Sequence, residues 1–170
     1  MRIAIVSKST KKGGGASKVA EDLANLLHKN GHTVHHYRRD LINGYTEHST
    51  SVYGKLEHIA KKIYFRLQSI GFQEIIPFEY IHLSKEIKRM NYDIIHFHDL
   101  TTAVSPYTLM LLSKKIPVVW TLHDCSSFTG GCIYPMDCNN YFSGCYNCPL
   151  KNQWPFGRNF DFAFLFFKLK

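Results

Sequence analysis

Residues 1–37 read MRIAIVSKSTKKGGGASKVAEDLANLLHKNGHTVHHY, in which a short apolar run, a helical pattern and a second apolar run follow one another. The two runs, Ile3–Val6 and Thr33–Tyr37, are rich in β-branched side chains, as buried strands are. The pattern between them predicts a helix from about Ser17 to Lys29, capped by Ser17 and ended at Gly31. A strand, a helix and a strand in this order indicate a parallel sheet with crossover helices. The helix should pack on the sheet through one face, formed by Val19, Leu23, Leu26 and Leu27.

The same alternation continues along the chain. Apolar runs at Ile94–Phe97 and Val118–Thr121 predict two further strands, and helices are expected at about 55–67 and 78–90. The polar stretch 41–54 is expected to be a loop. The predicted fold is therefore one Rossmann-like α/β domain over residues 1–170, extended by a Cys-rich excursion at 125–150 and an apolar tail at 160–170.

The composition is that of a globular domain with a basic surface. Of 170 residues, 45% are hydrophobic and 20% are charged, and 21 Lys and Arg against 13 Asp and Glu give a net charge of +8. Such a surface attracts phosphates, nucleic acid or anionic lipid headgroups. No helix-turn-helix, zinc-finger histidine pair or RNA-binding signature accompanies the charge, so no nucleic-acid partner is expected. The first apolar run is too short for a secretion signal and no run could span a bilayer, which favours a cytoplasmic protein.

A glycine-rich loop joins the first strand to its helix and consists of Gly13, Gly14, Gly15 and Ala16. Bare backbone there would let a phosphate approach N–H groups at the positive end of the helix dipole. The alternative is a plain flexible turn. The loop is not a dinucleotide fingerprint, because Lys18 stands where a small residue is needed. It is not a P-loop, because Val19 follows that lysine and supplies no hydroxyl for magnesium.

Several histidines stand where apolar strands end, which is the edge at which open α/β sheets bind ligands. His123 follows the last strand and could donate a hydrogen bond to a substrate, or be a structural histidine satisfied by backbone. His98 ends the preceding strand and is followed by Asp99, which makes these two residues candidates for an acceptor pocket. His96 shares the face of His98 and is expected to pack within the sheet. Asp124 is a third acceptor-pocket candidate, which could orient His123 or act alone.

Four cysteines are spaced Cys132-x5-Cys138-x6-Cys145-x2-Cys148, which places four thiols within 17 residues. That is compact enough for one tetrahedral zinc site. An iron–sulfur cluster, disulfides in oxidised protein and free packed thiols are the alternatives. Cys125 lies outside this group. A cysteine nucleophile is disfavoured, because nothing marks one thiol as activated.

The tail at 160–170 contains five phenylalanines and is too apolar to be free in solution. It is expected to dock as a helix on this domain or on a second one. Together with the basic amphipathic helix at 55–67, it is also a candidate for contact with an anionic membrane surface.

Taken together, these pieces resemble family 4 of the sequence-classified glycosyltransferases, in particular the bacterial subgroup that builds exopolysaccharides of the colanic-acid kind. The resemblance spans the whole chain but only the amino-terminal half of such an enzyme. Its most specific part is the last block of residues. The shared pieces are the glycine loop, DIIHFH at 93–98, VVWTLHD at 118–124, FTGGC at 128–132, Cys138, Gly144-Cys145 and Cys148-Pro149.

The resemblance implies the GT-B architecture of two Rossmann-like domains and a retaining transfer. The intact enzyme would move a sugar from a nucleotide diphosphate donor to a growing, lipid-diphosphate-linked oligosaccharide, with the acceptor held by this domain. The glycine loop would meet the donor diphosphate, and His123 would act beside the sugar as a catalytic residue. The family's Glu-x7-Glu pair belongs to the second domain and is missing here, since Glu79 and Glu86 are one residue too close. The 170 residues alone are therefore expected to be inactive.

Two other functions compete with this one. A non-catalytic module that recognises a glycan or an anionic lipid could use the same cleft, and downstream sequence with paired glutamates would favour the enzyme instead. An NADP-binding domain could use Arg38 and Arg39 to meet a 2′-phosphate, but the glycine pattern argues against it.

Overall fold

A computed structural model describes residues 1–9, 14–40, 49–70, 72, 75–98, 100–101, 103–152 and 160–169. They form a five-stranded sheet whose neighbouring strands are all parallel, which confirms the Rossmann-like α/β fold class. In spatial order the strands are β3 (Ser49–Ser51), β2 (Thr33–Arg38), β1 (Arg2–Ser7), β4 (Ile94–His98) and β5 (Val118–Thr121). Four of the five were predicted to within one residue at each end.

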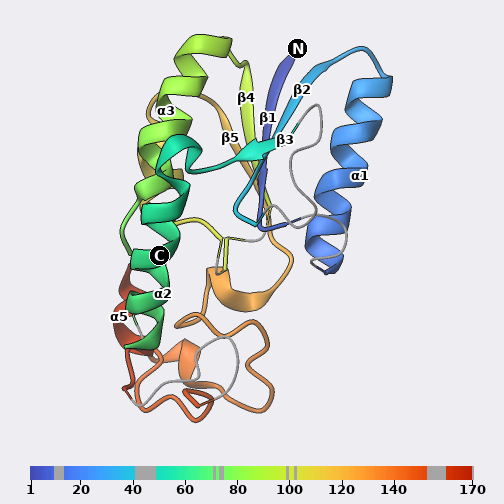
Figure 1. Cartoon of the computed structure of the whole chain (residues 1–170). Helices are drawn as coiled ribbons and strands as arrows, with labels where there is room; N and C mark the ends of the chain where they lie inside the picture. The colour runs from blue at the N-terminus through green and yellow to red at the C-terminus, as the bar shows by residue number, and fades with distance from the viewer. Residues whose placement is uncertain are drawn as a thin grey trace.

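Helices cover both faces of the sheet (Figure 1). One face carries α1 (Gly15–Lys29), and the other carries α2 (Glu57–Ser69), α3 (Phe78–Met90) and α4 (Pro106–Ser113). The carboxyl ends of the strands, the first turn of α1 and the Cys-rich segment all lie on the lower side of Figure 1. The fold therefore gathers at one edge most of the residues that the sequence singles out for chemistry.

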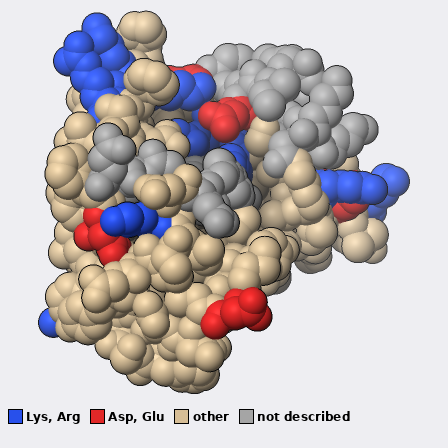
Figure 2. All heavy atoms as spheres, turned by 90° about the horizontal axis from the view of Figure 1, so that it is seen from below, with Lys and Arg blue, Asp and Glu red and all other residues tan. Residues whose placement is uncertain are grey.

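Figure 2 views the molecule from that lower side. The described Lys and Arg side chains stand there in separate groups, several of them beside Asp or Glu side chains, and much of the remaining described surface is uncharged. On the part of this face that the structure describes, the net charge of +8 is thus not gathered into one continuous basic patch.

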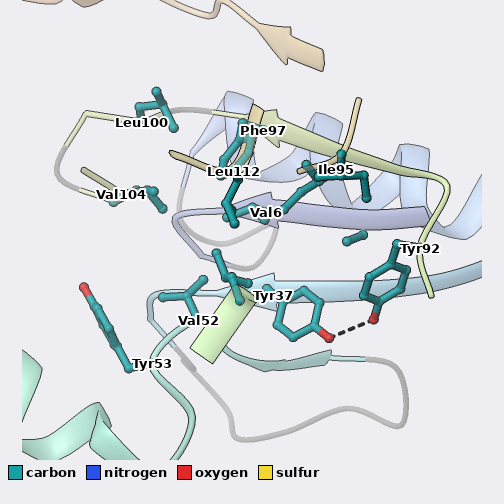
Figure 3. Close-up of a cluster of buried hydrophobic side chains, with 14 of the residues drawn as sticks. Val6, Tyr37, Val52, Tyr53, Tyr92, Ile95, Phe97, Leu100, Val104 and Leu112 are labelled. Carbon is teal, nitrogen blue, oxygen red and sulfur yellow. Dashed lines mark hydrogen bonds between the residues drawn. The ribbon is translucent and has the colours of Figure 1, made fainter. Parts of the chain in front are cut away.

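Each face of the sheet has its own core. Under α1 the core is small and contains Ile3, Ile5, Ala20, Ala24 and Val34. The opposite core is larger and is shown in Figure 3, where Val6, Ile95 and Phe97 from the central strands meet side chains of the helices and loops. Within this core the hydroxyls of Tyr37 and Tyr92 are hydrogen-bonded at 2.7 Å, so the polar ends of both rings are paired.

The first helix differs from its prediction in two respects. It begins two residues earlier, at Gly15, and its N-cap is Gly14 at φ 115, whereas Ser17 lies buried inside the first turn and caps nothing. The face on the sheet is also rotated: Val19 and Leu26 are 49% and 57% exposed. The reason is close approach, because small side chains at the buried positions let the helix axis lie nearer the sheet. These buried residues are Ser17, Ala20 and Ala24, with Leu23 and Leu27 partly buried beside them.

The edge strand β3 was not predicted, because 41–54 was expected to be a loop. Ser49–Ser51 pairs in parallel with β2, and its two outer serines are buried while the residue between them is exposed. The sequence gives no apolar alternation for this strand, because one face of it packs on polar groups. Residues 41–48 lie outside the described residues.

The apolar tail forms the short helix α5 (Ala163–Lys168) and packs on the Cys-rich segment. The ring of Phe164 stacks on Tyr146 with centroids 4.1 Å apart, and the ring of Phe162 lies 4.4 Å from that of Phe72. In the part of the chain that the structure describes, no helix has the length and apolarity needed to cross a bilayer.

Candidate functional site

Two histidines meet at the carboxyl ends of β4 and β5. His98 closes β4, and its register partner Thr121 closes β5, two residues before His123. This places His98 Nδ1 3.0 Å from His123 Nε2, with the two rings stacked at 5.2 Å between centroids. His98 is 1% exposed, whereas His123 is half-buried. One nitrogen of the pair donates and the other accepts, so each ring fixes the orientation and tautomer of its partner.

The buried histidines of this edge are neutral at physiological pH. Burial first, and then repulsion from the neighbouring imidazoles of His96 and His123 whenever these are protonated, lower the pKa of His98 to about 4. Burial and the Arg38 charge lower the pKa of His36, on β2, to about 3. These imidazoles therefore act as hydrogen-bond donors and acceptors, not as cations.

A polar layer continues from the histidine pair across the sheet, on the face that carries α1. Ser7 Oγ at the end of β1 is 2.7 Å from His36 Nε2, and His96 Nε2 is 2.7 Å from Thr121 Oγ1. Nearer the amino ends of the same strands this face is apolar, with Ile3 and Val34 under α1. The sheet thus changes from core to polar site along its length.

Three buried atoms of this edge have no hydrogen-bond partner within the described protein. Ser9 follows β1, Ser17 sits in the first turn of α1 and His98 ends β4, and the atoms concerned are Ser9 Oγ, Ser17 Oγ and His98 Nε2. A buried polar group without a partner costs about 1–3 kcal/mol. Such groups therefore mark a place where a ligand or water completes the structure.

The first turn of α1, the positive end of its helix dipole, lies beside this layer. Gly14 and Gly15 have open space around them, since a Cβ added at either would meet no atom within 4 Å. The first turn contains no acidic residue that would oppose an anion. Ala16 lies inside this turn, as part of the helix and not of the predicted loop. Gly13, the first residue of that loop, lies outside the described residues.

Asp124 belongs to a turn beside the histidine pair. Its Oδ1 accepts a 2.7 Å hydrogen bond from the backbone N–H of Ser126 and caps the turn Cys125–Ser127. Asp124 and His123 also line a shallow, open depression that encloses about 170 Å³. The other lining residues are Leu100, Trp120, Leu122, Ser126 and Ser127. Asp99, the remaining acceptor-pocket candidate, lies outside the described residues.

The four spaced cysteines come together below this edge. Cys132, Cys138, Cys145 and Cys148 line one pocket of about 300 Å³, and all five cysteines of the chain are free thiols. Burial first, and then the charges of Cys145 and Cys138, raise the pKa of the Cys132 thiol. Within the described ranges, no three His, Cys, Asp or Glu side chains already stand as a set of metal ligands.

Sequence reasoning missed Ser7, Ser9, Ser17 and His36 as members of the site. One signal was available: polar residues occupy alternate positions of the second strand, at His36 and Arg38, on a face that would otherwise be core. Arg38 itself is buried and donates a hydrogen bond to Ser49 Oγ, and Arg39 lies 6.0 Å from the Tyr64 ring centroid. Arg38 thus ends β2 at the site edge, but its side chain is buried there and is not open to a 2′-phosphate.

Comparison with known proteins gives two matches. The model of the family described as Glycosyltransferase Family 4 matches residues 13–163. Over 70 residues the chain is 42% identical to the putative colanic acid biosynthesis glycosyl transferase WcaC of Escherichia coli (strain K12), a stretch that covers 36% of this chain and 17% of that protein. The chain therefore matches less than a fifth of the length of this relative. No solved structure matches the chain significantly.

Proposed function

Because the chain belongs to glycosyltransferase family 4, we propose that it forms the acceptor-side half of a GT-B enzyme that works with retention in surface polysaccharide synthesis. The enzyme would transfer a sugar from a nucleotide diphosphate sugar to a lipid-linked oligosaccharide. Family membership supports the reaction class, and the polar edge of the sheet supports the place where it occurs.

The observation that carries the proposal is the hydrogen-bonded pair His98–His123 at the carboxyl ends of neighbouring strands. His98 is buried and held in β4, so its hydrogen bond fixes the orientation of the His123 ring. The His123 Nε2 atom faces His98, which leaves Nδ1 as the ring atom that would meet a sugar hydroxyl near the reacting carbon. In this arrangement His123 is the catalytic residue and His98 positions it.

The departing diphosphate would be stabilised by the first turn of α1. Its N–H groups, the open space at Gly14 and Gly15, and the unpartnered hydroxyls of Ser9 and Ser17 all suit an anion with many acceptor oxygens. Preorganised donors of this kind act where negative charge develops in the transition state. The acceptor would approach over the depression that contains Asp124.

A lipid-linked acceptor would bring the enzyme to a membrane surface. The exposed side of α2 carries Ile59 and Phe65, which are 57% and 76% exposed, together with exposed Lys62 and Arg66. Apolar and basic side chains in this combination suit peripheral contact with anionic lipid at the inner face of the cell membrane.

The test is sugar transfer by the complete native gene product. It would be assayed with a panel of radiolabelled nucleotide sugars and lipid-diphosphate-linked acceptors. We expect His123→Ala to lower kcat/KM by about 100-fold or more, the loss typical of removing one preorganised transition-state donor. The matched control is His58→Ala, which removes an exposed histidine of α2 and should leave the rate unchanged.

Two outcomes would count against the proposal. Normal activity of His123→Ala would show that the histidine pair is structural. A complete gene product that binds glycan or lipid but transfers no sugar would favour a non-catalytic binding module.

A further inference from the structure

The Cys lobe, residues 125–152, has a defined shape without a hydrophobic core. It lies beyond the carboxyl edge of the sheet as an irregular segment whose helical content is two short turns, Cys125–Ser127 and Asn140–Phe142 (Figure 1). No aliphatic or aromatic side chain of this fully described stretch is buried. Its buried residues are Ser126, Thr129, Gly130, Cys132 and Cys145. Four of its five aromatic residues, Phe128, Tyr134, Phe142 and Tyr146, are each at least half exposed, and the fifth, Tyr141, is partly buried. Segments of this kind need a staple of another sort.

Four sulfurs occupy the place where a core would be. The pocket of about 300 Å³ inside the lobe is lined by Cys132, Cys138, Cys145 and Cys148. The remaining lining residues are uncharged, namely Gly130, Pro135, Asn140, Tyr141, Leu150 and Ala163. Cys125, the fifth cysteine, does not line it. The lining is therefore uncharged, and the four thiols are its chemically reactive groups.

The backbone beside the pocket is strained at the turn that contains Cys145. Cys145 and Asn147 have left-handed φ values of 60 and 51, and Gly144 before them has φ 104. A left-handed non-glycine residue costs roughly 1–2 kcal/mol. The Gly130 N–H also donates to Cys145 Sγ at 3.1 Å, which is the type of bond that a thiolate accepts well. The lobe thus holds a strained turn at Gly144–Asn147, and the cysteines in and after it, Cys145 and Cys148, both line the pocket.

We propose that Cys132, Cys138, Cys145 and Cys148 bind one Zn²⁺ in a closed, structural, tetrahedral site. Four thiolates match the ligand type and number that structural zinc prefers. Binding would release the four thiol protons to solvent and form four Zn–S bonds, with no change of oxidation state. Because the side chains do not yet stand as a ligand set, the sulfurs would turn toward the centre of the pocket that they already line.

The zinc would fix more than the lobe itself. Ala163 of α5 lines the same pocket and packs on Gly130, where an added Cβ would come within 2.5 Å of the Ala163 carbonyl oxygen. The Cys148 N–H donates to Asp161 Oδ2 at 2.6 Å, and Asp161 Oδ1 accepts from the Ala163 N–H at 3.0 Å. The zinc site would therefore hold the tail, through Asp161 and Ala163, against the lobe. The lobe lies next to the edge of the sheet that carries His123.

The first test is metal content. The 170-residue chain is purified under reducing conditions without chelator. Inductively coupled plasma mass spectrometry should then find about one zinc per molecule. Cys145→Ser and Cys148→Ser should lose the zinc, while the matched control Cys125→Ser should keep it. Replacement by Co²⁺ should give the intense visible bands and sulfur-to-metal charge-transfer bands of a tetrahedral thiolate site.

The second test does not depend on the variants folding. Zinc stripped from the wild-type chain by a thiol reagent and chelator should lower Tm by roughly 5 °C or more, and Zn²⁺ but not Mg²⁺ should restore it. Three results would overturn the proposal: iron with visible cluster absorption, paired disulfides in the reduced preparation, or four free thiols in a zinc-free chain whose Tm is indifferent to chelator.

Discussion

His98 uses its two ring nitrogens differently, because Nδ1 is hydrogen-bonded to His123 and Nε2 is buried without a partner in the described protein. Strand-end position in the sequence was enough to single out both histidines. It could not indicate which of them is buried, since that depends on the helix and loops above the edge. The unpartnered Ser17 hydroxyl is a similar case: the sequence marks a helix cap, and only the rotation of α1 turns this serine inward.

The buried histidines predict a loss of stability in mild acid. His36 and His98 titrate at pKa values of about 3 and about 4 when folded, whereas an unfolded histidine titrates near 6.5. As the pH falls below this unfolded value, the unfolded chain takes up protons that the folded chain excludes. Each of the two histidines should therefore lower the free energy of unfolding by about 1.4 kcal/mol per pH unit until its folded pKa is reached.

This prediction is measured by urea unfolding at about pH 7 and about pH 4.5. His36→Gln keeps a polar group beside Ser7 but removes one of the two titrations. Between the two pH values, its free energy of unfolding should fall by less than that of the wild-type chain. The difference should equal the contribution of one histidine. Equal losses in both proteins would show that His36 is protonated as easily when folded as when unfolded.

At the scale of elements, two adjacent glycines at the start of α1 have different backbone conformations. Gly14 is left-handed at φ 115, whereas Gly15 is the first helical residue, and a Cβ at either position would meet open space. Gly14→Ala should therefore destabilise the fold by roughly 1–2 kcal/mol through backbone strain alone. Gly15→Ala should be neutral or stabilising by up to about 1 kcal/mol, since alanine favours helix.

Thermal unfolding of the two alanine variants tests the strain, and a third variant tests the site. Gly15→Val adds bulk at the turn without a left-handed residue, so in the complete enzyme it should lower turnover while the fold survives. If turnover and donor affinity were unchanged in Gly15→Val, the donor diphosphate would not bind at this turn.

A second element-scale feature is Glu79, which joins three helices on the opposite face. This buried α3 carboxylate accepts from the Ser105 N–H at 2.6 Å, from Thr108 Oγ1 at 2.8 Å and from the Tyr64 hydroxyl at 3.1 Å. Glu79→Ala would remove the acceptor of the buried Ser105 N–H and Thr108 hydroxyl, while the Tyr64 hydroxyl keeps the Ile76 carbonyl oxygen at 2.6 Å. We therefore expect a loss of about 2–4 kcal/mol in the free energy of unfolding. Glu57→Ala, at the partly exposed ion pair with Lys61, should cost less than about 1 kcal/mol. Similar urea midpoints for the two variants would contradict this role.

The elements that sequence predicted well are those with apolar periodicity. Strands β1, β2, β4 and β5 and helix α3 carry it, and their bounds agree with the prediction. The edge strand β3 does not carry it, because Ser49 and Ser51 face Arg38 and its surroundings instead of apolar side chains. Periodicity also could not show that Ala60 and Tyr64 form the buried face of α2. Which side of this helix is buried depends on the size and fit of its side chains more than on their hydrophobicity.

At the scale of the whole molecule, the described domain would supply one side of a cleft in the proposed enzyme. The site edge carries imidazole and hydroxyl groups that could donate hydrogen bonds to a sugar or a phosphate, but no carboxylate pair of the Glu-x7-Glu kind occurs anywhere in the sequence. The two glutamates nearest to that spacing are occupied elsewhere on α3. Glu79 is buried among its three donors, and Glu86 pairs with Arg89 and accepts from Tyr37.

This division of groups predicts that residues 1–170 alone bind nucleotide sugars feebly and do not turn them over. Half of the donor contacts would be missing, and a half-site that is open to water strengthens no electrostatic interaction. Titration calorimetry with a panel of nucleotide sugars should give no binding tighter than about millimolar, which corresponds to about −4 kcal/mol. The complete gene product, titrated in parallel, should bind at least one donor far more tightly. Micromolar binding by the 170-residue chain would place the donor site on this domain and reverse the assignment of the two halves.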